Sequence, residues 1–499
     1  MKNEFKIATP VSQFFKDMEV RKKLITYSDV LELRDNEIQI DSIKPFIYHS
    51  KFNILANWTS KEEEKLIELN KKYHLKAISF HLLSRYQENE IINNAFKGIG
   101  KPMTLLDIKK NVNSNIKLIR KVFKKGFTIL VENVNHLLTD AYDIIVGTNF
   151  IKEIVELNDI YLLFDLAHAQ ITCINKNLDF KEYINELPII RIKQIHLSGF
   201  EIIDGKAHDS HVTLKEKDWE IFKELAAQTN CLEYITLEYY KDAINFVVQL
   251  KKLRKIINEV IFENFFKILP WDSSFFGYSI ARLDYFYLNK DLFKFCIKKA
   301  KEENIECIYF TSNSNLQELN ESNRLIDIEI RNNYSRDLRE VDLNKNLSIE
   351  LATSKDISKI KDIASEAFRN MTRFYFDPHF KNEKVDELYI KWVDKLYYDS
   401  DSEIIIIKVN KNIAAFNGIT IKEESARITL IAVNELFRRK GYGERIIDHA
   451  IQFLIKKNIR KIKVSTQKKN LAANNLYSKL EFKLTNKKYL YHWWNEEIV

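Results

Sequence analysis

Four side chains that can bind a metal end four apolar stretches in the first half of the chain: Glu132, Asp165, His196 and Glu238. The carboxyl ends of the strands of a parallel barrel meet at one rim, so side chains from separate strands can converge there. Three carboxylates and one imidazole favour Mn, Mg, Co or Fe(II) over a structural zinc. The pattern therefore predicts a divalent-metal site, and the alternative for any one residue is an ordinary polar group at a strand end.

A second stretch with chemical potential lies near the C-terminus. An apolar, β-branched run that begins at Ile428 leads into RRKGYG, residues 438–443, and then into a helical pattern. The first N–H groups of a helix have no partner within the helix, and the helix dipole favours an anion beside them. Gly441 and Gly443 allow the backbone to come close to such a group. The stretch predicts a phosphate-binding loop, with a plain basic surface turn as the alternative.

The elements that must position the first four residues form a regular series. Eight short apolar runs alternate with helical patterns such as TSKEEEKLIELNKKYH, which has a capping residue at Thr59 or Ser60. The runs span residues 5–9, 29–33, 46–50, 77–82, 127–133, 161–168, 192–199 and 234–240. Eight strands joined by helical crossovers predict an α/β fold, a (β/α)8 barrel.

Length and composition limit the remaining possibilities. The 499 residues suffice for two or three domains, and 45% hydrophobic with 30% charged residues is typical of globular proteins. The net charge of +8 is spread along the chain, which favours small anions and argues against nucleic acid. The N-terminus lacks an apolar signal core, no apolar run approaches a membrane span, and the four cysteines have no paired spacing. We expect a cytoplasmic protein without membrane contact.

The order Glu132, Asp165-x-x-His168, His196, Glu238 resembles the xylose-isomerase-like barrels, in particular sugar isomerases and epimerases of the tagatose-epimerase kind. The resemblance covers roughly residues 5–257. It implies that the four positions bind a divalent metal and that Glu132 and Glu238 move a proton at a carbon next to a carbonyl. It also implies that His168 contacts substrate oxygens. His81, which ends the fourth predicted strand, is a further candidate substrate contact.

The segment after His196 departs from this family, which often places an arginine there. The chain instead has LSGFEIIDGKAHDSH, with Lys206, His208, Asp209 and His211. Such clusters also occur in related barrels that hold two or three irons and oxidise peptides. A solvated, histidine-rich loop on a barrel that serves only as a scaffold is the third alternative.

The order strand, RRKGYG, helix, strand and then N-x-x-A-x-x-L-Y resembles the Gcn5-related N-acetyltransferase (GNAT) family. The resemblance implies that Asn470 touches the arm of acetyl-CoA, that Tyr477 is the general acid, and that a strand amide near Ala432 or Val433 polarises the acetyl carbonyl. Glu481 stands where the family usually has glycine. The residues implied to hold the pyrophosphate are Arg438, Arg439, Lys440, Gly441, Tyr442 and Gly443.

A longer resemblance, over about residues 264–494, is to the dTDP-fucosamine acetyltransferases. It rests on WDSSFFG at 271–277 and on TRFYFDPHFKNEKVDELYIKWVDKL at 372–396. It implies an amino sugar or nucleotide sugar as acceptor, with Arg373, Phe374, Tyr375 and Asp377 either shaping the acceptor pocket or bracing the following helix.

The sequence thus predicts three segments. They are a barrel at 1–260, an N-terminal part of the acetyltransferase region at 261–345, and an α+β GNAT core at 346–499. We expect a bifunctional enzyme that acts on carbohydrate precursors, with an N-acetyltransferase domain and an isomerase- or epimerase-like barrel. A homodimer is one assembly compatible with this prediction. The alternative is an acetyltransferase that acts on a peptide or antibiotic beside an iron barrel.

Overall fold

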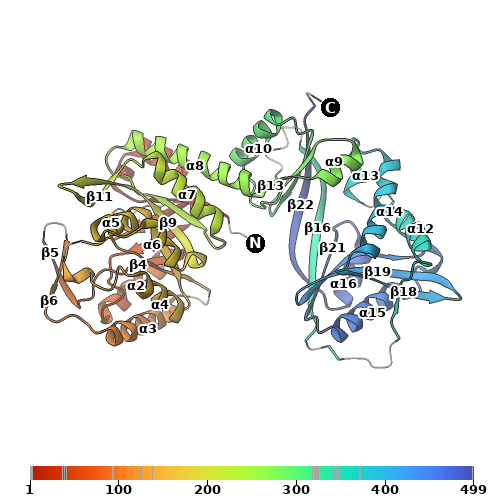
Figure 1. Ribbon diagram of the computed structural model, residues 1–499, viewed down its shortest axis with the longest axis horizontal. Helices are drawn as coiled ribbons and strands as arrows, with labels where there is room; N and C mark the ends of the chain where they lie inside the picture. Colours follow the sequence, from red (N-terminus) through yellow and green to blue (C-terminus); the bar gives the residue numbers. More distant parts are fainter. Residues whose placement is uncertain are drawn as a thin grey trace. The chain divides into compact units, whose positions relative to one another are not determined.

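The computed structural model describes residues 4–35, 38, 40, 42–92, 95–123, 126–137, 139–316, 319, 325–339, 341–342, 348–369, 372–496 and 498. The chain forms two compact units, Met1–Asn264 and Phe265–Val499 (Figure 1). The predicted boundary between residues 345 and 346 lies outside the described residues. In the described part of the chain, no helix is both long enough and apolar enough to cross a membrane.

The N-terminal unit contains a closed barrel of eight parallel strands, in the order β1-β12-β9-β8-β7-β4-β3-β2. Each strand overlaps one of the eight predicted runs, so the predicted (β/α)8 barrel is confirmed. The strands are β1 (Lys6–Pro10), β2 (Val30–Arg34), β3 (Phe46–Ser50), β4 (Leu75–His81), β7 (Thr128–Glu132), β8 (Tyr161–Asp165), β9 (Ile192–Leu197) and β12 (Tyr234–Leu237).

Helices surround these strands (Figure 1). The capping box predicted before the second helix is present, between Thr59 and Glu62. The predicted strand at 161–168 was too long, because the Asp165 side chain accepts the amide of His168 and so begins a helix. The helices are α1 (Met18–Tyr27), α2 (Ser60–Lys72), α3 (Leu105–Val122), α4 (Thr148–Leu157), α5 (Leu166–Lys176), α6 (Phe180–Glu186), α7 (Glu216–Gln228) and α8 (Ala243–Phe265).

Two antiparallel hairpins stand at the carboxyl ends of barrel strands. The strands β5 (Glu88–Ile92) and β6 (Ala95–Ile99) follow β4, while β10 (Gly199–Ile203) and β11 (Lys206–Val212) follow β9. Neither hairpin was predicted. The second one matters for the site, because it carries the histidine-rich segment after His196.

The C-terminal unit is built on a ten-stranded sheet in the order β13-β14-β15-β22-β16-β21-β20-β19-β18-β17. Most neighbours are antiparallel, whereas β20 and β21 are parallel. The strands are β13 (Phe266–Ile268), β14 (Ile280–Leu283), β15 (Cys307–Ser312), β16 (Leu325–Asp337), β17 (Glu350–Leu351), β18 (Ser402–Val409), β19 (Asn412–Lys422), β20 (Ser425–Val433), β21 (Lys461–Gln467) and β22 (Lys483–Trp494).

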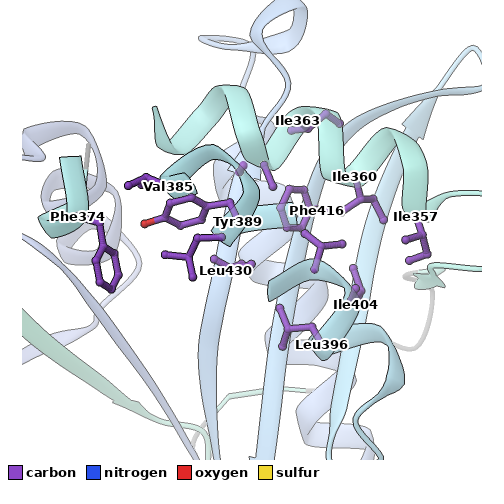
Figure 2. Close-up of a cluster of buried hydrophobic side chains, with 14 of the residues drawn as sticks. Ile357, Ile360, Ile363, Phe374, Val385, Tyr389, Leu396, Ile404, Phe416 and Leu430 are labelled. Carbon is purple, nitrogen blue, oxygen red and sulfur yellow. The ribbon is translucent and has the colours of Figure 1, made fainter. Parts of the chain in front are cut away.

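Helices cover both faces of this sheet, and each face has its own core. Side chains of β19 reach both cores, with Phe416 in one core and Ala415 in the other. The first core lies under α12 (Ile357–Phe368), α13 (Arg373–Phe376) and α14 (Asn382–Tyr398), as Figure 2 shows. The second lies under α15 (Tyr442–Lys456) and α16 (Leu471–Lys479). Two further helices are α9 (Pro270–Phe276) and α10 (Lys290–Glu302).

Candidate functional site

The four predicted metal ligands meet at the carboxyl end of the barrel. Nδ1 of His196 lies 3.4 Å from Oε1 of Glu132, 3.2 Å from Oε1 of Glu238 and 3.9 Å from Oδ2 of Asp165. All four residues are buried, with exposed fractions of 4% or less. The parallel register explains this convergence, because each residue stands at or just beyond the end of its strand.

Two further residues of this cluster, Glu32 and His49, were missed by the sequence analysis. Oε2 of Glu32 lies 3.2 Å from Nε2 of His196, and Nε2 of His49 lies 3.3 Å from Oε2 of Glu132. They come from β2 and β3, near the carboxyl end of each strand. The rule that found the other four would have found these two, had it been applied to the second and third predicted strands.

Histidines from other elements complete the cluster. Nε2 of His81 lies 3.0 Å from Oε2 of Glu132, and Nε2 of His168 lies 3.5 Å from Oδ2 of Asp209. His211, on the unpredicted hairpin, places Nε2 2.9 Å from Oε2 of Glu238. The structure therefore brings His81 and His168, predicted as substrate contacts, among the metal-competent groups. Asp209 and His211 join them, whereas Lys206 at the start of β11 is exposed.

These side chains form three groups, each of which could hold one metal ion, and they overlap. In every group the potential ligand atoms lie within 4.8 Å of one another. Glu132 belongs to two groups, so its carboxylate could contribute a ligand atom to either. The groups are His49, His81 and Glu132; Glu132, Asp165 and His168; and Glu32, His196 and Glu238.

The chemistry of these residues fits metal ions. Among the described residues, buried Oε2 of Glu132, Oδ2 of Asp165 and Nδ1 of His196 lie beside ionisable groups but make no well-directed hydrogen bond. Such orphaned groups are costly unless an unseen ligand satisfies them. Burial, together with the nearby carboxylates of Glu132 and Glu238, raises the pKa of Asp165 to about 7, and a bound cation would favour its charged form. Burial lowers the pKa of His49 to about 3, which keeps this imidazole in its neutral, ligating form.

Partners outside the cluster orient the imidazoles. Nδ1 of His168 donates to the carbonyl of Asn133 over 2.9 Å, and Nδ1 of His49 lies 2.8 Å from Oγ of Ser79. Both contacts leave the Nε2 atoms facing the cluster, as is usual for metal-binding histidines. The Arg34 guanidinium contacts the carboxylates of Glu32 and Glu238, so part of the negative charge is already balanced by the chain itself.

The second predicted site lies where β20 and β21 part. The two parallel strands pair only over residues 425–427 and 461–463, and beyond that point they diverge. The amide of Asn434 donates to the carbonyl of Ala414, so by the alternation of an antiparallel ladder the amide of Ala432 also faces β19. The amide of Val433 then faces the open side, where β21 has separated. Of the two predicted polarising amides, the register thus selects Val433.

The loop 438–443 connects this opening to α15. Gly441 is the N-cap of the helix with φ of 79°, a left-handed conformation that favours glycine. A Cβ on Gly443 would lie 3.3 Å from Leu476, so this glycine lets α15 approach α16 closely. Arg438 and Lys440 are exposed, and they surround the first turn of the helix with positive charge. This arrangement suits a phosphate group.

The predicted residues of α16 differ in their surroundings. Tyr477 is buried, with ring centroids 5.8 Å from Tyr334 and 5.7 Å from Phe482, and burial raises its pKa. Asn470 caps the helix, because its side chain accepts the amide of Ala473. Glu481 adopts φ of 59°, so it keeps the left-handed backbone that a glycine would take at the end of this helix.

Comparison with known families finds one match in each unit. Residues 56–260 match the family described as RiPP precursor modification enzyme MbnB/TglH/ChrH, and residues 362–482 match the Acetyltransferase (GNAT) family. The chain joins an MbnB/TglH/ChrH-type barrel to a GNAT domain. The predicted acetyltransferase fold of the C-terminal part is thereby confirmed, whereas the specific likeness to dTDP-fucosamine acetyltransferases stays a prediction.

Individual relatives cover parts of the chain. A UPF0276 protein of Acaryochloris marina (strain MBIC 11017) is 31% identical over 86 residues, which are 17% of this chain and 31% of the relative. The spore coat polysaccharide biosynthesis protein SpsD of Bacillus subtilis (strain 168) is 24% identical over 143 residues, 28% of this chain and 48% of the relative. The chain therefore spans less than half the length of each. A functionally unknown conserved protein from Staphylococcus epidermidis ATCC 12228 has a TM-score of 0.36 at 16% identity, covering 46% of this chain and 89% of that one.

The predicted acceptor residues of the GNAT domain divide into two sets. The Arg373 guanidinium lies over the rings of Tyr309 and Phe374, 4.4 Å and 4.5 Å from their centroids. The Tyr375 hydroxyl donates instead to Asp386 of α14, which is a bracing contact within the helical layer. Asp377 is buried and accepts from Nδ1 of His492 over 2.6 Å and from Nε1 of Trp494 over 2.9 Å.

The Asp377–His492 pair predicts a pH-dependent stability. Burial lowers the pKa of His492 from 6.5 to about 4, so between these values the unfolded chain binds a proton that the folded chain does not. Lowering the pH through this window should destabilise the GNAT domain, by up to about 3 kcal/mol. His492→Asn keeps an N–H donor for Asp377 but cannot titrate. We expect its urea midpoint to fall less between pH 7 and pH 4.5 than that of the wild type; equal falls would contradict the assignment.

Proposed function

We propose that the barrel modifies a peptide at a multinuclear metal centre and that the GNAT domain acetylates an amine with acetyl-CoA. The observation that carries the first half is the position of Glu132, which belongs to two ligand groups at once. A mononuclear sugar isomerase needs one such group. The matched family is described as modifying RiPP precursors, that is, ribosomally made peptides, and this supports a peptide substrate.

The ligand set favours iron among the metals that the sequence allows. His49, His81, His168 and His196 add imidazole nitrogens to the carboxylates, whereas Mg prefers oxygen ligands. When bound, the metal ions would supply Lewis-acid or redox chemistry at the barrel rim. The chain itself would hold the imidazoles of His168 and His49 in one tautomer, through Asn133 and Ser79, and would keep the carboxylates desolvated.

In the GNAT domain the residues divide the work of acyl transfer. The amides of the 438–443 loop would bind the pyrophosphate of acetyl-CoA, and the open amide of Val433 would stabilise negative charge that develops on the acetyl oxygen. The acceptor ammonium loses one proton to water, its nitrogen forms the bond to the acetyl carbon, the carbon–sulfur bond breaks, and the nitrogen then loses a second proton to solvent, which replaces the proton that Tyr477 donates. Tyr477, which burial keeps protonated, would donate a proton to the departing sulfur.

A second candidate function is the one that the sequence alone favours, an acetyltransferase of amino sugars or nucleotide sugars beside a metal-dependent isomerase barrel. The similarity to SpsD supports it, because that relative is named for polysaccharide biosynthesis. In this case the barrel would bind a single divalent ion through Glu132, Asp165, His196 and Glu238.

Metal counting combined with an acceptor panel separates the two candidates. The full chain is purified without oxygen from iron-supplemented cells, its metals are counted by elemental analysis, and thiol release from acetyl-CoA is followed with peptides and with nucleotide-linked amino sugars. We expect two or more irons per chain and acetylation of peptide amines. One Mn, Mg or Co ion per chain with acetylation of the sugar would favour the second candidate. A metal-free barrel would indicate that the barrel is a scaffold without catalytic activity.

A further inference from the structure

A small cavity adjoins the carboxyl end of β21 in the GNAT domain. Its volume is about 70 Å³, and its walls come from β16, α13, β21 and the start of α16. Most of the lining is apolar, including Phe376. One acidic residue, Glu329, lies in the wall, opposite the polar residues Gln467, Lys469 and Asn470.

Glu329 is held in this wall by a local irregularity of the strand. The pairing of β16 with β22 shifts register between Asp327 and Glu329, and such bulges redirect side chains. The residue is only 6% exposed. Oε1 of Glu329 accepts from Nε of Arg331 over 3.0 Å, whereas its buried Oε2 has no hydrogen-bond partner within the described residues. A buried carboxylate oxygen without a donor is costly, which points to a missing ligand.

The cavity adjoins one of the two elements that present the transfer groups, and one of its walls packs near the other. Its wall residue Phe376 belongs to α13, and Phe374 of the same helix packs in one buried cluster with Leu430 and Ala432 of β20 (Figure 2). Asn470, also in the wall, begins the helix that carries Tyr477. A group bound in the cavity would therefore lie beside the start of the helix of the acid and against α13, which packs in the same core cluster as the strand of the open Val433 amide.

We propose that this cavity binds the amine of the acetyl acceptor and that Oε2 of Glu329 accepts a hydrogen bond from it. The assignment rests on the proposed acetyl transfer and names its acceptor class, a primary amine that arrives as an ammonium ion. Cavity size limits the part that enters to the amine and the carbons next to it.

The surrounding charges suit an amine that must be held and then deprotonated. Arg331 neutralises one oxygen of Glu329, so the carboxylate attracts the ammonium without fixing it as a cation. Lys469 in the wall adds positive charge, and Arg373, one helical turn from Phe376, adds more. These cations weaken the binding of the ammonium and ease its loss of a proton before attack on the thioester, so the hydrogen bond to Glu329 must carry the preference for the cation.

The test compares two small probes that differ in charge but not in size. At pH 7 n-butylamine is a cation, whereas O-propylhydroxylamine has the same number of heavy atoms and is neutral. Their binding to the full chain, saturated with coenzyme A, is measured by ligand-observed NMR. We expect the wild type to prefer the cation by about tenfold or more, the usual effect of a hydrogen bond to a charged group. Glu329→Gln should abolish this preference.

Arg331→Gln is the matched control, because it breaks the same ion pair from the other side. If the pair were only structural, both variants would behave alike; we expect the Arg331 variant to keep or increase the preference for the cation. No preference in the wild type, or an unchanged one in Glu329→Gln, would overturn the assignment. Coenzyme A binding is recorded in the same samples, and its absence would count against the transferase itself rather than against the role of Glu329.

Discussion

A Glu132→Gln variant is expected to lose the ions of two ligand groups at once. Its carboxylate is part of both the His49–His81 group and the Asp165–His168 group, and an amide is a much poorer ligand for iron. Replacing an outer-shell partner typically costs 10–100-fold in metal affinity, so loss of this bridging ligand should cost at least about 100-fold. Elemental analysis of the variant and the wild type, purified in parallel under the same conditions, measures the metal content per chain.

Two matched variants make this result specific. Glu32→Gln touches only the third group and should remove at most one ion. Glu201→Gln changes an exposed carboxylate on β10 and should leave the metal content as it is in the wild type. If Glu132→Gln kept its full metal content, the bridging role would be wrong, and circular dichroism of all three variants would show whether any loss reflects unfolding instead.

In the GNAT domain, Val433→Pro is expected to reduce kcat for acetyl transfer by about 100- to 1000-fold, the usual effect of removing one donor to a developing oxyanion. Proline deletes the amide that faces the opening between β20 and β21, yet the ladder to β19 does not use this amide. Coenzyme A should still bind, because the 438–443 loop is untouched. Thiol release and coenzyme A titration measure the two effects separately.

Ala432→Pro is the control one residue away. The Ala432 amide faces Phe416 in the ladder, so its loss should lower the melting temperature of the domain clearly more than Val433→Pro does. Two variants with equal melting temperatures and equal kcat would show that the register does not separate the two amides. A fully active Val433→Pro variant would remove the amide from the mechanism.

Much of the barrel and its rim could be predicted, because strands of a parallel barrel are short apolar runs that end in register. The ligands Glu132, Asp165, His196 and Glu238 follow from this rule alone. Glu32 and His49 obey it too, but each lies inside its predicted run, before the last residue, which made the rule harder to apply. Asp209 and His211 depend on a hairpin that folds back over the rim, a long-range contact that local patterns do not encode.

The GNAT loop was predictable because a turn between strand and helix is local. Selection of Val433 over Ala432 needed the ladder register, and the orphaned oxygen of Glu329 needed a bulge between distant strands. Both depend on pairing partners far away in the chain. Sequence patterns name the residue types available for such positions but not the atoms that remain unpaired.

The place of β22 in the second sheet bears on how the protein is made. This strand follows every other strand in the chain, yet it lies between β15 and β16, with residues 489–494 paired to β15. During synthesis on the ribosome, β15 and β16 emerge before β22, so the sheet cannot form completely until β22 has been made. The barrel is complete once α8 has been made and can fold earlier. The barrel could thus bind the proposed metal ions while the second unit is still being synthesised. The exposed edges of β15 and β16 then make the nascent GNAT domain the part most in need of chaperone protection.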